Sequence, residues 1–167
     1  MAEIEPSSFE ESEHITLCRA TGADCQGILR CLRSAFAPYE SAYTPGAYQD
    51  TVLTPETLDR RLLDMCVLVA VNKSEIVGTL AYNVTPESDG HLRGMAVIPE
   101  WQGRGIASRL LHQAEFELRA NHCRRCTLDT SAPLERAISF YRSHGYTATG
   151  KQSDLFGMPL FEYSKQL

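Results

Sequence analysis

The chain has 167 residues, of which 43% are hydrophobic, and its 16 basic and 21 acidic residues give a net charge of −5. This size predicts one domain with its own hydrophobic core, and the lack of a basic excess argues against a nucleic-acid-binding protein. No apolar run approaches the ~20 residues that cross a bilayer, and the acidic N-terminus does not resemble a secretory signal. We therefore expect a cytoplasmic protein with neither a nucleic-acid nor a membrane partner.

The net charge is unevenly distributed along the chain. Residues 1–13 contain five glutamates and no Lys or Arg, so this segment accounts for the whole charge of −5. Its Glu, Ser and Pro content predicts a flexible acidic tail, which leaves residues 14–167 as one domain. Within that domain, residues 101–151 hold eight basic and four acidic residues, a balance of +4. The positive charge is therefore concentrated in one segment.

The cysteines form no recognisable disulfide or metal pattern. A domain of this length needs no disulfide to fold, and His122, Cys123 and Cys126 supply only half of a zinc site because no second CxxC pair exists. We therefore expect reduced thiols and no metal ion. The six residues are Cys18, Cys25, Cys31, Cys66, Cys123 and Cys126.

The first predicted elements are a strand and a helix. Residues 15–19 alternate between apolar and polar side chains, as expected of a strand. Thr21 and Asp24 have the spacing of a capping box, and residues 25–36 place apolar side chains on one helical face. We therefore predict a helix that begins just after Thr21.

The next segment changes character before a predicted hairpin. Residues 37–53 contain two prolines, a glycine and three interleaved tyrosines, which predict a loop or a broken helix. Residues 54–56 combine a capping Thr, a first-turn Pro and a first-turn acid, so a short helix begins there. The apolar segments 66–71 and 76–84 flank a polar turn and predict a β-hairpin, and residues 90–98 predict the next strand.

The second half of the chain predicts two helices and three strands. Apolar periodicity places the helices over residues 105–120 and 133–144, and Gly145 stands where a helix-ending glycine belongs. This element order is typical of a mixed α/β layer domain and not of a regular βαβ winding. The strands are predicted at residues 126–129, 146–150 and 160–165, with a loop over residues 153–159.

One turn carries the strongest chemical signal. A predicted strand ends near Pro99, and the run Gln102-Gly103-Arg104-Gly105-Ile106-Ala107 leads directly into the amphipathic helix. Such a junction exposes unpaired N–H groups at the positive end of the helix dipole, and glycine lets a ligand approach the backbone. It therefore predicts a phosphate site, with an ordinary strand–helix turn as the alternative. A dinucleotide fingerprint would need Gly at position 108, which is Ser, and a P-loop would need Gly-Lys-Ser/Thr.

This turn resembles the coenzyme A loop of the GCN5-related N-acetyltransferase (GNAT) family, written Gln/Arg-x-x-Gly-x-Gly/Ala. Gln102, Gly105 and Ala107 occupy its defined positions. The run from Ala137 to Tyr146 is similar to the family's second motif, Ala-x-x-x-Tyr-x-x-x-Gly-Phe, with Tyr in place of Phe. Two motifs in the right order are far more specific than either alone, and the resemblance covers roughly residues 15–165.

The resemblance implies a fold and a cofactor. The fold is a mixed α/β domain with a mostly antiparallel central sheet of about six to seven strands, splayed at the cofactor site and flanked by about four helices. The cofactor is acetyl-CoA, whose phosphates the arginines of the basic segment, such as Arg104, Arg109 and Arg142, would neutralise. The implied cofactor-binding residues are Met95, Ala96, Val97, Gln102, Gly103, Arg104, Gly105, Ile106, Ala107, Ser108, Ala137, Phe140, Tyr141 and Arg142.

The resemblance also implies a reaction, in which a primary amine attacks the thioester directly in a ternary complex and no enzyme nucleophile is needed. Tyr141 matches the family's acid for the departing thiolate. The backbone N–H of Val97, with Ala96 as the neighbouring alternative, matches the donor to the thioester oxygen. Leu134 stands seven residues before Tyr141, where many members have Asn, so a side-chain contact to the pantetheine arm is in question there.

The acceptor side is less defined by the sequence. Arg93 and the acceptor candidates lie on segments that would face the incoming amine, and none is singled out as the base. The amine is expected on a small metabolite, an antibiotic or a protein, and the protein is expected as a monomer or a homodimer. The alternatives are a non-catalytic acyl-CoA sensor of the same fold and a nucleotide-binding domain. The acceptor candidates are Tyr39, Glu40, Tyr43, His91, Asp129 and Phe156.

Overall fold

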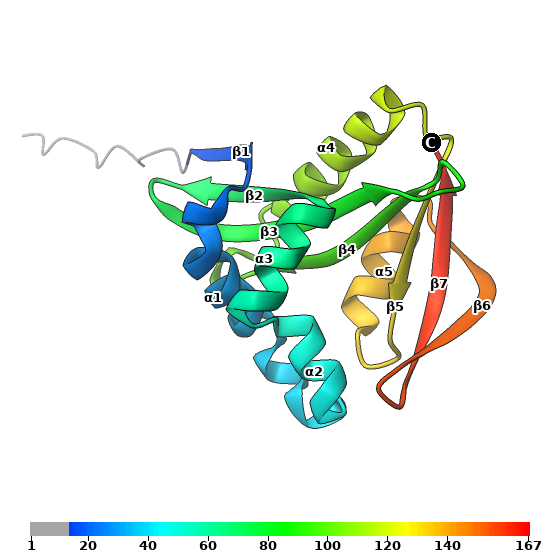
Figure 1. Cartoon of the computed structure of the whole chain (residues 1–167), viewed down its shortest axis with the longest axis horizontal. Coiled ribbons are helices and arrows are strands. Elements are labelled where there is room, and N and C mark those ends of the chain that lie inside the picture. The colour runs from blue at the N-terminus through cyan, green and yellow to red at the C-terminus, as the bar shows by residue number, and fades with distance from the viewer. Residues whose placement is uncertain (1–13) are drawn as a thin grey trace, which may run out of the picture.

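Seven strands form one sheet in residues 14–167, the part of the chain that the computed structural model describes (Figure 1). The sheet order is β1-β2-β3-β4-β5-β7-β6, and all neighbours are antiparallel except β4 and β5. The mostly antiparallel mixed α/β fold expected from the sequence is therefore confirmed. The strands are β1 (Ile15–Arg19), β2 (Cys66–Asn72), β3 (Glu75–Val84), β4 (Gly90–Val97), β5 (Arg125–Thr130), β6 (Thr147–Leu155) and β7 (Met158–Gln166).

The helices begin and end largely where local sequence signals predict. The capping boxes at Thr21 and Thr54 both form, with Pro55 in the first turn after Thr54. Gly145 follows the α5 helix with a φ of +90°, a conformation that glycine adopts without strain. The helices are α1 (Cys25–Phe36), α2 (Pro45–Val52), α3 (Pro55–Asp64), α4 (Ile106–Ala120) and α5 (Glu135–Ser143).

Two predictions about secondary structure need correction. The loop expected over residues 153–159 is instead the tip of the β6–β7 hairpin, which turns at Phe156 and Gly157 with φ values of +49° and +83°. Strand β6 is an edge strand that is exposed along almost its whole length, so it lacks the alternation that identifies a half-buried strand. The broken segment before α3 contains a complete helix, α2, because Thr44 caps it and Pro45 occupies its first position.

Strands β4 and β5 are joined along only part of their length. Their parallel pairing covers Gly90–Leu92 and Cys126–Leu128, after which the two strands separate. The next residues of β5, Asp129 and Thr130, pair only with β7. A wedge-shaped gap therefore opens in the middle of the sheet, between the end of β4 and the end of β5.

Strand β4 carries a bulge next to this gap. Thr79 pairs with Ala96 and Ala81 pairs with Arg93, so the single residue Leu80 faces two residues of β4. One of these two is Gly94, whose φ of +67° favours glycine. A bulge bends its strand and interrupts the hydrogen-bonded ladder, and here it does so beside the gap.

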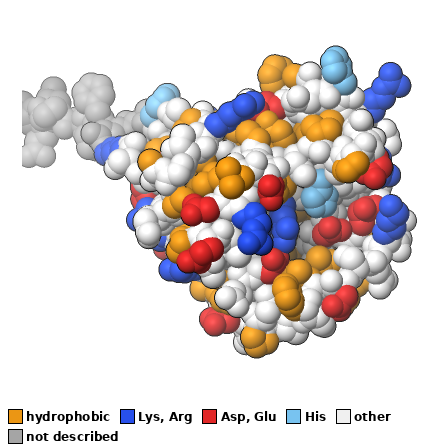
Figure 2. All heavy atoms as spheres, in the orientation of Figure 1, with side chains coloured by type: hydrophobic (Ala, Val, Ile, Leu, Met, Phe, Trp, Pro, Cys, Tyr) orange, Lys and Arg blue, Asp and Glu red, His pale blue; other side chains and the backbone are white. Residues whose placement is uncertain are grey.

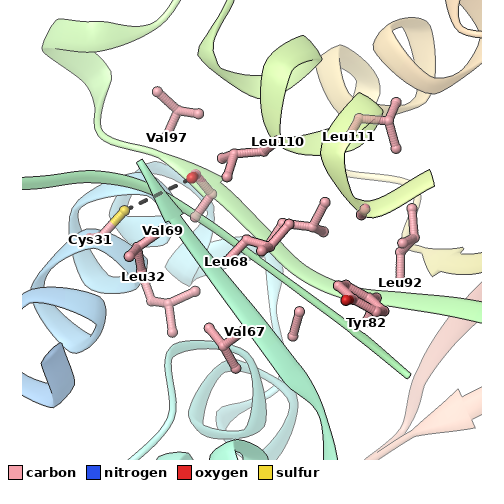
Figure 3. Packing of buried hydrophobic residues seen from close by; sticks show 14 of the residues in the cluster. Cys31, Leu32, Val67, Leu68, Val69, Tyr82, Leu92, Val97, Leu110 and Leu111 are labelled. Atoms are coloured by element: carbon pink, nitrogen blue, oxygen red, sulfur yellow. Dashed lines mark hydrogen bonds between the residues drawn. The ribbon is translucent and has the colours of Figure 1, made fainter. Parts of the chain in front are cut away.

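The core lies on both sides of strands β2 and β3. Helix α1 packs on one face and α4 on the other, as the labelled Leu32 and Leu110 show in Figure 3. The Cys31 thiol also lies 3.9 Å from the carbonyl of Ala96 in β4 (Figure 3). A Cβ atom at Gly78 would lie 3.1 Å from Leu110, so glycine lets α4 sit close to the sheet. This close packing places the start of α4 beside the end of β4.

A buried ion pair connects α4 to the last strand. The Glu115 side chain is only 2% exposed, and both of its carboxylate oxygens accept hydrogen bonds of 2.9 Å from the Lys165 ammonium. The Tyr146 hydroxyl donates a third hydrogen bond to this carboxylate at 3.0 Å. Because these partners come from α4, β7 and the residue before β6, the cluster joins the two parts of the sheet that flank the gap.

Removing Lys165 alone should be costly. A Lys165→Met change leaves the buried Glu115 carboxylate with the Arg119 guanidinium, 3.7 Å away, as its remaining cation, and we expect the free energy of unfolding to fall by about 3 kcal/mol, the low end for a broken buried pair. The double variant Lys165→Met/Glu115→Gln removes both charges and should recover most of the loss. Urea denaturation of the two variants tests this, with Lys151→Met on exposed β6 as the control. Equal losses in the single and double variants would contradict the role of the pair.

Candidate active site

A cavity of about 760 Å³ lies at the gap between β4 and β5. Its lining residues come from α1 to α3, β4, the loop before α4 and the start of α4, the end of β5, α5 and the β6–β7 hairpin. Figure 2 shows acidic and basic side chains gathered around the hollow on this face of the molecule. The cavity is therefore built by segments that are distant in sequence and brought together by the sheet.

The glycine-rich turn opens into this cavity. Gly103 and Gly105 have φ values of +76° and +77°, a conformation that side chains rarely adopt, and a Cβ at either position would meet no atom within 4 Å. The first helical hydrogen bond of α4 runs from the Arg109 N–H to Gly105 O, and no side chain caps the helix start. The first N–H groups of α4 therefore remain available to an anion.

Gln102 holds the turn in place. Its Nε2 donates to the Val97 carbonyl at 2.9 Å, and its Oε1 accepts from Arg136 at 3.0 Å. The side chain thus links the end of β4 to the first turn of α5 across the turn. Both atoms of its amide are hydrogen-bonded to protein groups, so the side chain holds the glycine-rich turn in position.

The arginines of the basic segment divide into two groups. Arg104 stacks over the Trp101 ring at 4.6 Å, beside the glycine turn. Arg109 donates to the Ile15 carbonyl, and Arg142 donates to the Tyr163 hydroxyl at 3.2 Å, so both turn away from the cavity. Arg136, which the sequence motifs did not indicate, lines the cavity next to the turn. Arg104 and Arg136 are therefore the basic side chains closest to the predicted phosphate site.

The end of β4 directs backbone groups into the gap. The Ile98 N–H donates to Val77 O at 3.0 Å, and hydrogen-bonded pairs alternate along an antiparallel ladder. The N–H of Val97 therefore points away from β3, toward the side from which β5 has separated. Met95 and Ala96 also line the cavity, which places the whole predicted β4 segment there.

Tyr141 reaches the same cavity from α5. Its residue is 6% exposed, and its ring packs against that of Tyr146 at a centroid distance of 5.6 Å. Within residues 14–167 its hydroxyl makes no hydrogen bond, and burial raises its pKa well above the ordinary value of 10. The group is therefore a protonated donor without a protein acceptor. Phe140 and Ala137, the other predicted residues of this helix, line the cavity beside it.

A second unpartnered hydroxyl also lines the cavity. Thr130, in the part of β5 beyond the gap, is 3% exposed, and its Oγ1 has no hydrogen-bond partner among the described residues. Because buried polar groups are nearly always satisfied, an orphaned hydroxyl that lines a cavity indicates a missing polar partner. Leu134, at the position where the motif often has Asn, lines the cavity with an apolar side chain instead.

His91 has a defined tautomer. The Thr127 hydroxyl donates its proton to Gly90 O at 3.2 Å, so it accepts from His91 Nδ1, which lies at 2.9 Å. The proton of the neutral imidazole is therefore on Nδ1, and Nε2 carries a lone pair 3.8 Å from a carboxylate oxygen of Asp129. Burial lowers the pKa of His91 below 6.5, Arg93 lowers it further, and Asp129 and Glu162 oppose the shift. The imidazole is thus neutral near pH 7.

The remaining acceptor candidates are only partly brought together. Tyr39 and Tyr43 line the cavity, and the Tyr43 hydroxyl hydrogen-bonds Ser131 at 3.1 Å. Glu40 and Phe156 do not line it. Phe156 is 63% exposed at the hairpin tip, where its carbonyl accepts from Thr44 at the start of α2. Four charged residues that the motifs did not indicate do line the cavity, and they are Asp50, Arg61, Arg136 and Asp154.

The cysteines lie outside the cavity lining and are all unpaired. Burial raises the pKa of both Cys31 and Cys126 to about 12, so these thiols are protonated at neutral pH. No cluster of three or more His, Cys, Asp or Glu side chains within residues 14–167 is placed to hold a metal ion. No helix in that same range has the length and apolar character needed to cross a membrane.

Comparison with known proteins identifies the family of the chain. Residues 29–146 match the model of the acetyltransferase (GNAT) family. An uncharacterized protein, YdhI of Bacillus subtilis (strain 168), is 33% identical over 78 residues, which are 46% of this chain and 47% of that relative. The match thus spans about half the length of the curated relative.

Solved structures share the fold. The PaiA N-acetyltransferase of Thermoplasma acidophilum, determined in complex with coenzyme A, superposes with a TM-score of 0.78 at 18% identity, covering 92% of this chain and 99% of that one. The ribosomal-protein-alanine N-acetyltransferase of Brucella melitensis gives 0.70 at 24% identity, covering 91% and 99%. At these identities the likeness concerns the fold, whereas the family match rests on the sequence itself. The chain belongs to the GNAT acetyltransferase family.

Proposed function

We propose that this protein is an N-acetyltransferase that moves an acetyl group from acetyl-CoA to a primary amine by direct attack. One observation carries the proposal: two features line the same cavity. They are the free N–H groups at the start of α4 and the unpartnered, protonated hydroxyl of Tyr141. The first suits a pyrophosphate and the second a departing thiolate. Acetyl-CoA supplies both groups, together with an acetyl thioester that an amine can attack.

The residues on the cavity wall fit this cofactor along its length. The N–H groups of residues 103–108 would bind the pyrophosphate, with Arg104 and Arg136 beside them. The gap between β4 and β5 would admit the pantetheine arm against the backbone of Met95–Val97. The orphaned Thr130 hydroxyl would bond a polar group of that arm, since Leu134 offers no amide.

Three groups would serve the chemical step. The Val97 N–H would stabilise the negative charge that develops on the thioester oxygen. Tyr141 would donate its proton to the departing sulfur, because its hydroxyl is protonated, lines the cavity and has no acceptor among residues 14–167. His91 Nε2 would accept a proton from the amine, directly or through water, because its lone pair is free and its Nδ1 is held by Thr127. No cysteine takes part.

The first test is amine-dependent release of coenzyme A. Purified protein is mixed with acetyl-CoA and a panel of primary amines, and the free thiol is followed colorimetrically. Release that depends on an amine, with mass-spectrometric detection of the acetylated product, supports the proposal. Calorimetric binding of acetyl-CoA without release from any amine would instead identify an acyl-CoA sensor.

Gly105→Glu should abolish coenzyme A binding. The new carboxylate would meet the pyrophosphate at the helix start, and we expect a loss of affinity of at least about 10²-fold, measured by calorimetry. Gly150→Glu is the matched control, because Gly150 also has a positive φ of +86° and open space, but lies on exposed β6. Parallel losses in both variants would trace the effect to backbone strain and remove the turn from the site.

Tyr141→Phe should lower turnover and leave the affinity for coenzyme A nearly unchanged. The ring still packs in the core, while the proton for the sulfur is lost, so we expect kcat to fall by about 10²-fold. Single-turnover kinetics and calorimetry separate the two effects, and Tyr48→Phe, outside the cavity, serves as the control. An unaltered kcat would assign Tyr141 to packing alone.

The rate should depend on pH through His91. The active base is neutral and its pKa lies below 6.5, so kcat/KM should be lost as pH falls through that value and should be constant above it. His91→Asn keeps a donor near Nδ1 and removes Nε2, so the variant should be slow and lack this acid limb. Two acceptors of different amine pKa separate enzyme from substrate titration. An acid limb that persists in the variant would place the base elsewhere, for example at Asp129.

A further inference from the structure

One guanidinium in the cavity has no hydrogen-bond or ion-pair partner among residues 14–167. Arg61 of α3 lines the cavity and is half-buried, yet it forms no hydrogen bond or ion pair with any residue in the range 14–167. Its nearest charges are the like charge of Arg93 and the carboxylate of Asp50. Asp50 is already engaged, because its Oδ2 accepts from Arg93 at 2.5 Å. The three side chains therefore carry one uncompensated positive charge.

Such an arrangement is unfavourable for the folded protein alone. Removing a cation from water without a partner costs free energy, and arginine is otherwise a residue that forms bidentate pairs. Burial, with a smaller effect from Arg93, lowers the pKa of Arg61 to about 10, so the group is still charged at neutral pH. A partly desolvated, unpaired charge in a cavity is typical of a ligand-binding position.

The place of Arg61 identifies which ligand it faces. Its Nη1 lies 2.6 Å from the point where a Cβ of Gly94 would stand, so the guanidinium rests directly on the bulge of β4. Gly94 lies on the same strand as His91 and Arg93, three residues before Val97, whereas the glycine-rich turn follows the end of that strand. Arg61 therefore lies on the acceptor side of the cavity and not at the phosphate site.

Carboxylates outside the cluster of Arg61, Arg93 and Asp50 are also present in the cavity. Asp129, beside His91 Nε2, and Asp154 on the β6–β7 hairpin also line it. An ammonium group is attracted to these carboxylates, whereas an anion is attracted to Arg61. The cavity thus offers binding groups for a cation and for an anion to the same molecule.

We propose that the acceptor is an amine that also carries a carboxylate, with Arg61 and Arg93 as the residues that bind the acid group. The inference rests on the proposed transferase function and specifies its substrate class as amino acids, in which one small molecule bears both groups. The single uncompensated charge matches a carboxylate better than a dianionic phosphate. A planar guanidinium can grip such a carboxylate with two parallel hydrogen bonds.

Matched acceptor pairs test this class. The pairs are L-leucine with L-leucinamide, L-lysine with L-lysinamide and 4-aminobutyrate with butylamine, and 2-aminoethylphosphonate is the phosphonate probe. Each is titrated by calorimetry into protein saturated with coenzyme A, and each is assayed for coenzyme A release with acetyl-CoA. We expect the carboxylate member of at least one pair to bind about 10-fold tighter or more, and to be the better acceptor.

Two variants assign the preference to the arginine. Arg61→Met should weaken the binding of the carboxylate member of a pair by about 10- to 100-fold and leave the binding of the amide or amine member unchanged. Its melting temperature should stay equal or rise, because an unpaired charge is removed, whereas a structural role would lower it. Arg61→Lys keeps the charge but loses the two parallel N–H donors of the guanidinium, so it should retain part of the preference for the carboxylate member. Arg30→Met, on the surface near Glu75, controls for net charge.

Each outcome decides the proposal. Equal binding within every pair, binding of neither member in any pair, tighter binding of the phosphonate than of every carboxylate, or a preference that survives Arg61→Met would overturn it. Carboxylate preference that Arg61→Met abolishes supports it. If that preference appears by calorimetry while no amine releases coenzyme A, the acid subsite stands and the transferase function fails.

Discussion

The site depends on one feature of the sheet: β4 and β5 pair over only a short part of their length. Three residue pairs hold the two strands together, and then they diverge while β5 continues along β7. Every functional feature follows from that divergence. It turns the free backbone edge of β4 toward a cavity, it brings α5 and its tyrosine to the other side, and it leaves the head of α4 at the opening. The Glu115 cluster clamps the two parts of the sheet, so the gap is held open by a fixed frame.

The polar groups of the cavity are arranged by kind. Near the head of α4 the donors are backbone N–H groups, which bind an anion without conformational cost because the helix already fixes their direction. On the acceptor side the groups are charged side chains from five separate elements, α2, α3, β4, β5 and β6. The first arrangement suits a cofactor shared by a whole family. The second is set by individual side chains, which can change without disturbing the fold.

Local signals and long-range contacts explain what could be predicted from the sequence. Gly103, Gly105 and Tyr141 were predictable because each satisfies a short-range pattern, and the structure places all three at the cavity. The full length of the β6–β7 hairpin was not predictable, because an exposed edge strand lacks the alternation of apolar and polar residues that identifies a half-buried strand. Arg142 and Arg136 lie six residues apart on one helix, and only the packing of α5 decides that the first faces Tyr163 and the second faces Gln102. Arg61 could not be singled out from the sequence, because its lack of a partner within residues 14–167 depends on the tertiary structure.

The burial of the thiols has a chemical consequence for a protein that handles a thioester. A thiolate exchanges acyl groups readily with a thioester, whereas a protonated thiol does so poorly. Cys126 lies on β5, whose residues Leu128 to Thr130 line the cavity, and the Cys31 thiol lies 3.9 Å from the carbonyl of Ala96, which also lines it. Their raised pKa values keep them protonated, and neither side chain opens into the cavity. These two thiols are therefore poor nucleophiles toward a thioester.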